Sequence, residues 1–138
     1  MAQIRSAEWG TEDYWKTRIE RYMRGEQDPQ KALKPRILYV ALQNSVVIGF
    51  IAGHLTRRYE CDGEMQWINV IAEERNFGIA AALLHLLGQW FASQHAFKIC
   101  VDVDPDNIVA RNFYIKHGAT ELNRHWLVWN DVRSIGRA

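Results

Sequence analysis

Apolar and polar positions follow two different periods along the chain, and the change of period predicts where helices and strands lie. Short runs rich in β-branched and aromatic residues, separated by polar turns, are typical of strands. Runs in which apolar residues recur every three to four positions are typical of helices packed on one face. The expected ranges are 11–25 for a first helix, 37–42, 46–56 and 64–72 for three strands, 78–94 for a long helix, 97–103 for a buried strand, about 106–117 for a last helix, and 119–123 and 125–131 for two final strands. The order α, β, β, β, α, β, α, β, β indicates a mixed α/β sheet.

The third predicted strand carries the candidate chemistry, so the faces of its side chains matter. Its alternation assigns one face to Glu64, Gln66, Ile68 and Val70, and the other to Met65, Trp67, Asn69 and Ile71. In the strand before it, Gly49 and Gly53 indicate a bulge or a bend. For the last helix, either Asp104 or Asp106 is the expected N-cap, with Gly118 at its end.

Length and composition indicate one globular domain. The chain has 138 residues, 48% of them hydrophobic and 24% charged, so residues 1–138 are expected to share one core. A formal net charge of +1 predicts neither a nucleic-acid partner nor an anionic membrane surface. No apolar run approaches the roughly 20 residues that span a bilayer, so no membrane partner is expected.

The two cysteines and the N-terminus bear on cellular location and metal binding. Cys61 and Cys100 stand in no metal-ligand spacing, so no metal site is expected. Free thiols fit a reducing compartment, and the N-terminus has no apolar stretch like that of a signal peptide. Together these features predict a cytoplasmic protein.

A short polar turn between the third strand and the long helix is the strongest chemical signal. A helix N-terminus presents backbone N–H groups without intrahelical acceptors and about half a positive charge, both suited to a phosphate. Gly78 lacks a Cβ, so an anion can approach the backbone there, and the small side chains of Ala80 and Ala81 keep the approach clear. The alternative is that Gly78 merely punctuates the turn. The sequence contains neither a P-loop nor a dinucleotide-binding fingerprint.

Two motifs resemble the GNAT superfamily of acyl-CoA-dependent N-acyltransferases. "RNFGIA" at 75–80 matches the pattern [QR]xxGx[GA], and "NIVARNFYIKHGA" at 107–119 matches Nxx[AS]xxFYxxxGF except at Ala119. The motifs lie about 30 residues apart, as in that family, and the resemblance covers roughly residues 36 to 130. It implies a single GNAT-like domain: a mixed, mostly antiparallel sheet with a splayed pair of central parallel strands, flanked by helices. It places the CoA-binding core at about residues 64–118.

The resemblance implies direct transfer of an acetyl group from acetyl-CoA to an amine. Backbone N–H groups of the turn would hold the CoA diphosphate, and the strand ending near Val70 would pair with the pantetheine amides as an added strand would. The second motif would flank the pantetheine arm. The residues implied to contact CoA are Ile68, Asn69, Val70, Ile71, Arg75, Phe77, Gly78, Ile79, Ala80, Ala81, Asn107, Ala110, Phe113 and Tyr114.

Acid–base chemistry adds two candidate catalytic residues. Tyr114 in the second motif is the candidate acid for the leaving thiolate; the alternative is an aromatic residue packed on the sheet. A lysine amine of pKa near 10.4 is only about 1 part in 2,500 neutral at pH 7, which costs about 4.6 kcal/mol, against about 1.4 kcal/mol for an α-amine. Glu64 is the candidate base, with Glu60, Asp62 and water as alternatives. The other interpretation of Glu64 is an exposed residue at the strand start.

The sequence leaves the acceptor open. A small-molecule or a peptide amine is expected, and a homodimer is left open. A non-catalytic acyl-CoA-binding or sensing domain of the same fold is the alternative function, and a small α/β binding module without a CoA site is a third. Tyr114 favours the enzyme, because a sensor has no need of an acid.

Overall fold

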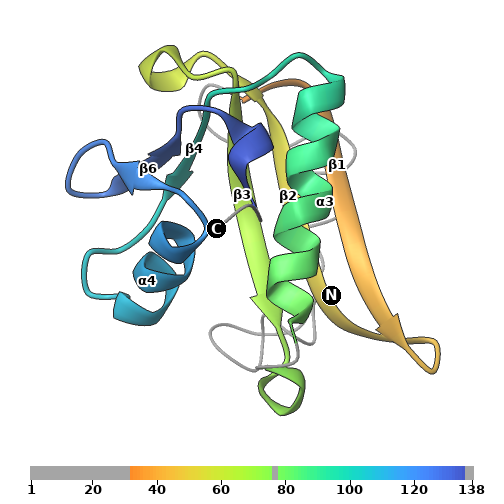
Figure 1. Cartoon of the computed structure of the whole chain (residues 1–138). Helices are drawn as coiled ribbons and strands as arrows, with labels where there is room; N and C mark the ends of the chain where they lie inside the picture. The colour runs from red at the N-terminus through yellow and green to blue at the C-terminus, as the bar shows by residue number, and fades with distance from the viewer. Residues whose placement is uncertain (1–31, 76–77, 136–138) are drawn as a thin grey trace.

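A six-stranded mixed sheet forms the centre of the molecule, with strand order β1-β2-β3-β4-β6-β5 (Figure 1). The computed structural model describes residues 32–75 and 78–135, so the predicted first helix lies outside the described residues. The strands are β1 Ala32–Gln43, β2 Val46–Thr56, β3 Gly63–Val70, β4 Ile99–Asp102, β5 Thr120–Glu121 and β6 Trp126–Trp129. The helices are α3 Ile79–Ser93 and α4 Ile108–Lys116, with 3-10 turns η1 Arg58–Glu60, η2 Ala72–Glu74 and η3 Val132–Ser134. The predicted mixed sheet is confirmed.

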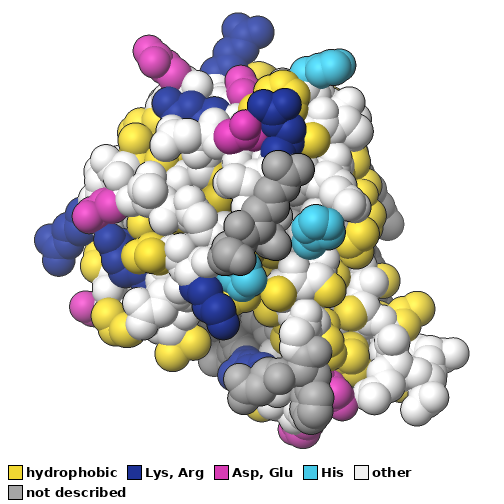
Figure 2. All heavy atoms as spheres, in the orientation of Figure 1, with side chains coloured by type: hydrophobic (Ala, Val, Ile, Leu, Met, Phe, Trp, Pro, Cys, Tyr) yellow, Lys and Arg dark blue, Asp and Glu magenta, His cyan; other side chains and the backbone are white. Residues whose placement is uncertain are grey.

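The two α-helices of the described residues pack against the same face of the sheet and bury the main core. In Figure 1, α3 crosses in front of β2 and β3, while α4 lies apart from it beside β4 and β6. The main core joins Leu84, Leu87 and Phe91 of α3 and Tyr114 of α4 to sheet residues such as Ile51. On the side seen in Figure 2, acidic and basic side chains are interspersed, in keeping with the small net charge.

The central strands β3 and β4 run parallel and then separate. Their ladder has three pairs, from Gly63↔Ile99 to Met65↔Val101, and it ends there although β3 continues to Val70. Every other strand pair is antiparallel. Figure 1 shows the two strands diverging toward the end of β3. The expected splayed pair is therefore present, and it opens a gap in the middle of the sheet.

A bulge in β3 overturns the predicted alternation of this strand. Trp67 pairs with Ala52, but Met65 pairs with Gly53, so Gln66 is an extra residue in β3. Met65 consequently packs in the main core on the α3 side, whereas Trp67 packs on the opposite face with Ala52. The bulge that the glycines of the preceding strand indicate is real, but it lies in β3 opposite Gly53.

Glu64 lies before the bulge, so its predicted face is wrong. Its partners are His54 in β2 and Cys100 in β4. Cys100 packs on the face away from α3, while its neighbours Ile99 and Val101 belong to the main core. Glu64 therefore points away from the face that carries Val70, because one inserted residue reverses the side on which all earlier residues of a strand lie.

Three predicted boundaries also change. β1 begins before Pro35, which sits at an irregularity between Leu33 and Arg36, as expected for proline in an edge strand. β3 ends at Val70, and η2 follows it. The N-cap of α4 is Asn107 and not Asp104 or Asp106, because the Asn107 Oδ1 accepts a hydrogen bond from Ala110 N at 3.1 Å.

Gly63 allows α3 to approach the sheet, and this predicts a stability effect. A Cβ at Gly63 would overlap the ring of Phe91 and lie 2.9 Å from Ile99 Cδ1. Gly63→Ala should lower the free energy of unfolding by about 1–3 kcal/mol, the usual range for overpacking. The measurement is chemical denaturation. Gly88→Ala is the control, since its Cβ would lie 3.4 Å from its nearest neighbours and alanine favours a helix interior. Equal stability of the two variants would contradict the packing role.

Candidate functional site

A large pocket lies between the end of β3, the start of α3 and the length of α4. Its volume is about 1290 Å³, above the roughly 300–1,000 Å³ typical of pockets for drug-sized ligands. Its lining residues are Val46, Val47, Ile68, Asn69, Val70, Ile71, Ala72, Glu73, Glu74, Arg75, Gly78, Ile79, Ala80, Ala81, Asn107, Val109, Ala110, Phe113, Tyr114, Lys116 and His117. All the CoA-contacting residues predicted from the sequence are among them except Phe77, which lies outside the described residues.

The N-terminus of α3 opens onto this pocket without a side-chain cap. Gly78 is the N-cap residue, and the first turn holds no acidic side chain. The N–H groups of Ile79, Ala80 and Ala81 therefore have no intrahelical acceptor. Gly78 has φ +78°, and a Cβ built on it would meet nothing within 4 Å. The glycine is explained by its left-handed backbone and by the open space of the pocket, not by packing.

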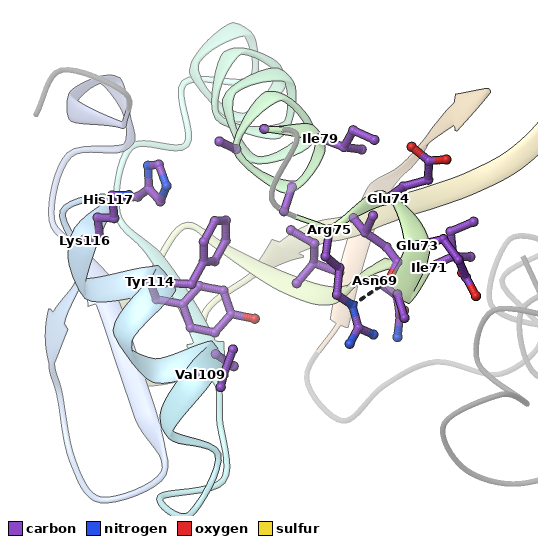
Figure 3. Close-up of a pocket in the computed structure, with 18 of the residues that line it drawn as sticks. Asn69, Ile71, Glu73, Glu74, Arg75, Ile79, Val109, Tyr114, Lys116 and His117 are labelled. Atoms are coloured by element: carbon purple, nitrogen blue, oxygen red, sulfur yellow. Dashed lines mark hydrogen bonds between the residues drawn. The ribbon is translucent and has the colours of Figure 1, made fainter. Parts of the chain in front are cut away.

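Arg75 stabilises the end of β3. Its Nε donates a hydrogen bond to the carbonyl of Val70 at 3.0 Å, drawn as the dashed line in Figure 3. The guanidinium thereby fixes the turn that joins β3 to α3. Arg75 also lines the pocket, so it both braces the end of β3 and places a positive charge there.

The charges around the pocket are balanced. Glu73 and Glu74 line it on the side of β3 and are offset by Arg75 on the same side and by Lys116 of α4, next to which His117 also lines it (Figure 3). Burial lowers the pKa of His117, and the nearby Lys116 lowers it further, so at neutral pH this imidazole is uncharged. With its side-chain charges offset, the backbone N–H groups of α3 are the main feature of the pocket that favours an anion.

Tyr114 projects from α4 into the same pocket. Its side chain is buried against Phe113 and the edge of the Trp129 ring, with ring centroids 5.7 Å apart in both contacts. In Figure 3 its hydroxyl points away from α4 and across the pocket, toward the side where Arg75 and Asn69 lie. The tyrosine is thus both a packed aromatic residue and a hydroxyl presented to the pocket, so the two readings of the sequence are compatible.

Glu64 does not line this pocket, because the bulge turns it to the other face. It is buried there, with its Oε1 3.1 Å from Arg58 Nε and 3.8 Å from His54 Nε2. The Arg58 guanidinium lies 4.8 Å from the ring centroid of Trp126, and the Tyr59 ring meets Trp126 edge-on at 5.4 Å. Glu64 therefore belongs to a charged and aromatic cluster on the face opposite α3.

The two alternative acids differ in their surroundings. The Asp62 Oδ2 accepts hydrogen bonds from the backbone N–H groups of Phe97 and Lys98, both at 3.0 Å. Asp62 thus ties the loop after β2 to the start of β4. Glu60 is exposed and has φ +60°, next to Tyr59 at φ +53°.

Comparison with models of known protein families identifies the family of this chain. The model of the acetyltransferase (GNAT) family matches residues 5–119, which is most of the chain. The chain belongs to the GNAT acetyltransferase family. The resemblance seen in the two motifs is confirmed, and the splayed pair of central strands agrees with the fold that it implied. No curated protein matches the chain.

Solved structures show the same fold at low sequence identity. An aminoglycoside antibiotic 6'-N-acetyltransferase from Acinetobacter haemolyticus is 16% identical, with TM-score 0.72, covering 88% of this chain and 83% of its own. The PaiA N-acetyltransferase from Thermoplasma acidophilum, crystallised with coenzyme A, is 18% identical, with TM-score 0.63 and coverage of 85% and 69%. A putative streptothricin acetyltransferase from Bacillus anthracis, crystallised with acetyl coenzyme A, is 24% identical, with TM-score 0.58 and coverage of 78% and 68%.

The sequence missed several pocket residues of this GNAT domain. Val109 and His117 follow from Phe113 by steps of four along α4, so the helical period was a usable signal for them. Val46 and Val47 come from the start of β2, and only tertiary structure brings them to the pocket. Among the described residues there is no metal-ligand cluster and no helix long and apolar enough to cross a membrane.

Proposed function

We propose that this chain transfers the acetyl group of acetyl-CoA directly to an amine. The observation that carries the proposal is the continuous pocket that runs from the uncapped N-terminus of α3, along the diverging end of β3, to the hydroxyl of Tyr114. Relatives of the same fold bind coenzyme A or acetyl coenzyme A in their crystals. The alternative, a non-catalytic acyl-CoA-binding domain, would share this pocket and lack turnover.

On the donor side, the N–H groups of Ile79 to Ala81 bind the diphosphate, with Gly78 leaving the approach clear. Backbone amides and the helix dipole favour an anion together, which offsets the carboxylates of Glu73 and Glu74. The pantetheine arm follows the backbone of 68–71, where β4 has diverged and a ligand can take the place of a strand. Asn107, Ala110 and Phe113 flank the arm from the other side.

The thioester then lies where the β3–β4 ladder closes, beside Tyr114. As the amine nitrogen attacks the carbonyl carbon, the new C–N bond forms and the C–S bond breaks. The thiolate takes a proton from the Tyr114 hydroxyl, which regains one from solvent.

The nitrogen loses its proton on the opposite face of the sheet. Glu64, directly or through a water molecule, is the acceptor we propose there. Its ion pair with Arg58 fixes the position of the carboxylate, and His54 at 3.8 Å is a neighbour that can pass the proton onward. The acid and the base then act on the two sides of the gap between β3 and β4.

Two measurements test the proposed function. Acetyl-CoA at about 100 times its dissociation constant stabilises a protein by about 2.7 kcal/mol, which raises the melting temperature by several degrees. Release of free thiol in the presence of a panel of amines then measures transfer. No thermal shift at millimolar acetyl-CoA would refute CoA binding. A shift without amine-dependent thiol release would favour the sensing domain.

A further inference from the structure

Asp102 occupies the position on β4 that immediately follows the last β3–β4 pair. The ladder ends at Met65↔Val101, and Asp102 pairs only with Trp126 on the other side. Val101 belongs to the main core, while Cys100 packs on the opposite face, so Asp102 shares the face of Cys100 and Glu64. An exposed carboxylate thus stands at the mouth of the gap, on the side away from the CoA pocket.

No side chain of the described residues makes a direct ion pair with this carboxylate. Glu64 is paired with Arg58 at 3.1 Å, but Asp102 has neither a hydrogen bond nor an ion pair of its side chain within the described part of the chain. Desolvation raises the pKa of Asp102; His125 and Arg58 lower it, and Glu64 and Asp104 raise it. The charged form is therefore destabilised in the unliganded protein, and a bound cation would relieve that.

The rings of Trp126 and Tyr59 lie on the same face as Asp102. Trp126 is the cross-strand partner of Asp102, and the ring of Tyr59 meets Trp126 edge-on. Tyr59 is 45% exposed and is held with φ +53°, followed by Glu60 at φ +60°. Two successive non-glycine residues in the left-handed region are unusual, and such strain tends to occur where a loop presents side chains to a ligand. Trp126 is half-buried, with the Arg58 guanidinium 4.8 Å from its ring centroid, so the exposed ring beside the carboxylate is that of Tyr59. A carboxylate beside an exposed aromatic ring is a surface that can bind an alkylammonium group.

We propose that Asp102 binds the ammonium group of the acceptor, so that the enzyme selects alkylamines that are cationic at neutral pH. This inference rests on the proposed function and adds the substrate class to it. The acceptor lies on the Asp102 face of the gap, between the carboxylate and the rings of Tyr59 and Trp126. The ammonium group is a feature shared by a small polyamine and by a lysine side chain of a peptide.

The carboxylates of Asp102 and Glu64 then have separate roles. Asp102 binds the incoming R–NH₃⁺, and one proton passes to Glu64 or its water as the nitrogen enters the gap. The neutral nitrogen attacks the thioester, and its second proton is released after the C–N bond forms. In sum, R–NH₃⁺ and acetyl-CoA give the amide, CoA thiol and one proton, with Tyr114 supplying the proton on sulfur and regaining another from solvent.

The test compares Asp102→Asn with Asp104→Asn in the full chain. Both variants remove one negative charge, but Asp104 instead accepts a hydrogen bond from Asp106 N at 2.9 Å, which an asparagine oxygen can also accept. Spermidine and a peptide with one internal lysine serve as cationic probes. An arylamine that is uncharged at neutral pH serves as the neutral probe.

Asp102→Asn should raise the KM of the cationic amines about 10- to 100-fold, as expected for a lost contact to a charged group. In this variant the arylamine KM and the acetyl-CoA dissociation constant should not change. Asp104→Asn should leave unchanged both of these and the KM of the cationic amines. In the wild type, the KM of the cationic probes should fall as pH rises through the raised pKa of Asp102, because only the ionised carboxylate binds the cation. Asp102→Asn should lose that pH dependence.

Calorimetric titration of spermidine into the CoA-bound protein gives a readout independent of turnover. Binding that is lost in Asp102→Asn and kept in Asp104→Asn supports the inference, and the better of the two cationic probes identifies the source of the ammonium. Unchanged spermidine binding and unchanged KM in Asp102→Asn would overturn it while leaving acetyl transfer intact. A wild type without any affinity for acetyl-CoA would instead refute the proposed function, and this inference with it.

Discussion

Replacing Gly78 with aspartate should abolish CoA binding, while replacing it with asparagine should only weaken it. Both side chains tolerate the left-handed backbone that Gly78 adopts at φ +78°, and they have nearly the same size. They differ in charge, and the aspartate would place a carboxylate at the N-terminus of α3, where the diphosphate should bind. We expect a loss of affinity of at least 100-fold for Gly78→Asp relative to Gly78→Asn, measured by calorimetry with CoA.

Stability separates this effect from unfolding. Since a Cβ at position 78 meets nothing within 4 Å, neither variant should disturb packing, and the left-handed conformation should cost each about 1 kcal/mol. Aspartate should even be the more stable of the two without ligand, because a negative charge at a helix N-terminus is favourable. Equal affinity of the two variants for CoA would show that the N-terminus of α3 does not hold the diphosphate.

Tyr114→Phe should slow acetyl transfer about 100- to 10,000-fold, the usual contribution of a general acid. Phenylalanine keeps the contacts with Phe113 and Trp129, so the fold and the affinity for acetyl-CoA should be preserved. The measurement is kcat from thiol release, with the dissociation constant of acetyl-CoA determined alongside.

The choice of donor thioester provides a control for this effect. A donor with a more acidic thiol needs less help as it leaves, so an activated thioester should recover part of the lost rate in Tyr114→Phe and gain little in the wild type. Full activity of Tyr114→Phe with acetyl-CoA would show that the residue has only its packing role.

The sequence was sufficient for the glycine at the start of the long helix and for the order of the elements from residue 32 onward. The strand–turn–helix at Gly78 and the helix carrying Tyr114 are local patterns, and local patterns survive in the tertiary structure. The predicted range of the long helix, 78–94, differs from α3 by one residue at each end. The two motifs identified the family because each lies at a junction where backbone geometry and ligand contact depend on the same few residues.

The side chains of β3 were not predictable in the same way. The bulge at Gln66 depends on how β2 and β3 pair, and no residue in the sequence of β3 predicts it. Alternation therefore put Glu64 on the face of Val70, although in the structure it pairs with Arg58 on the other face. The position of Asp102 was not predictable for a similar reason. It lies just past the end of the β3–β4 ladder, and that end depends on the pairing of residues more than 30 positions apart.

The sheet separates two faces of the molecule, and the gap between β3 and β4 is an opening between these faces. Tyr114 and the N-terminus of α3, where we propose that CoA binds, lie on one side, and Glu64 and Asp102 lie on the other. Donor and acceptor can then arrive by separate routes, and neither must leave for the other to bind. Both can be present together, so the acetyl group has no need of a temporary carrier on the protein. The acetylated product can depart by its own route while CoA is still in place.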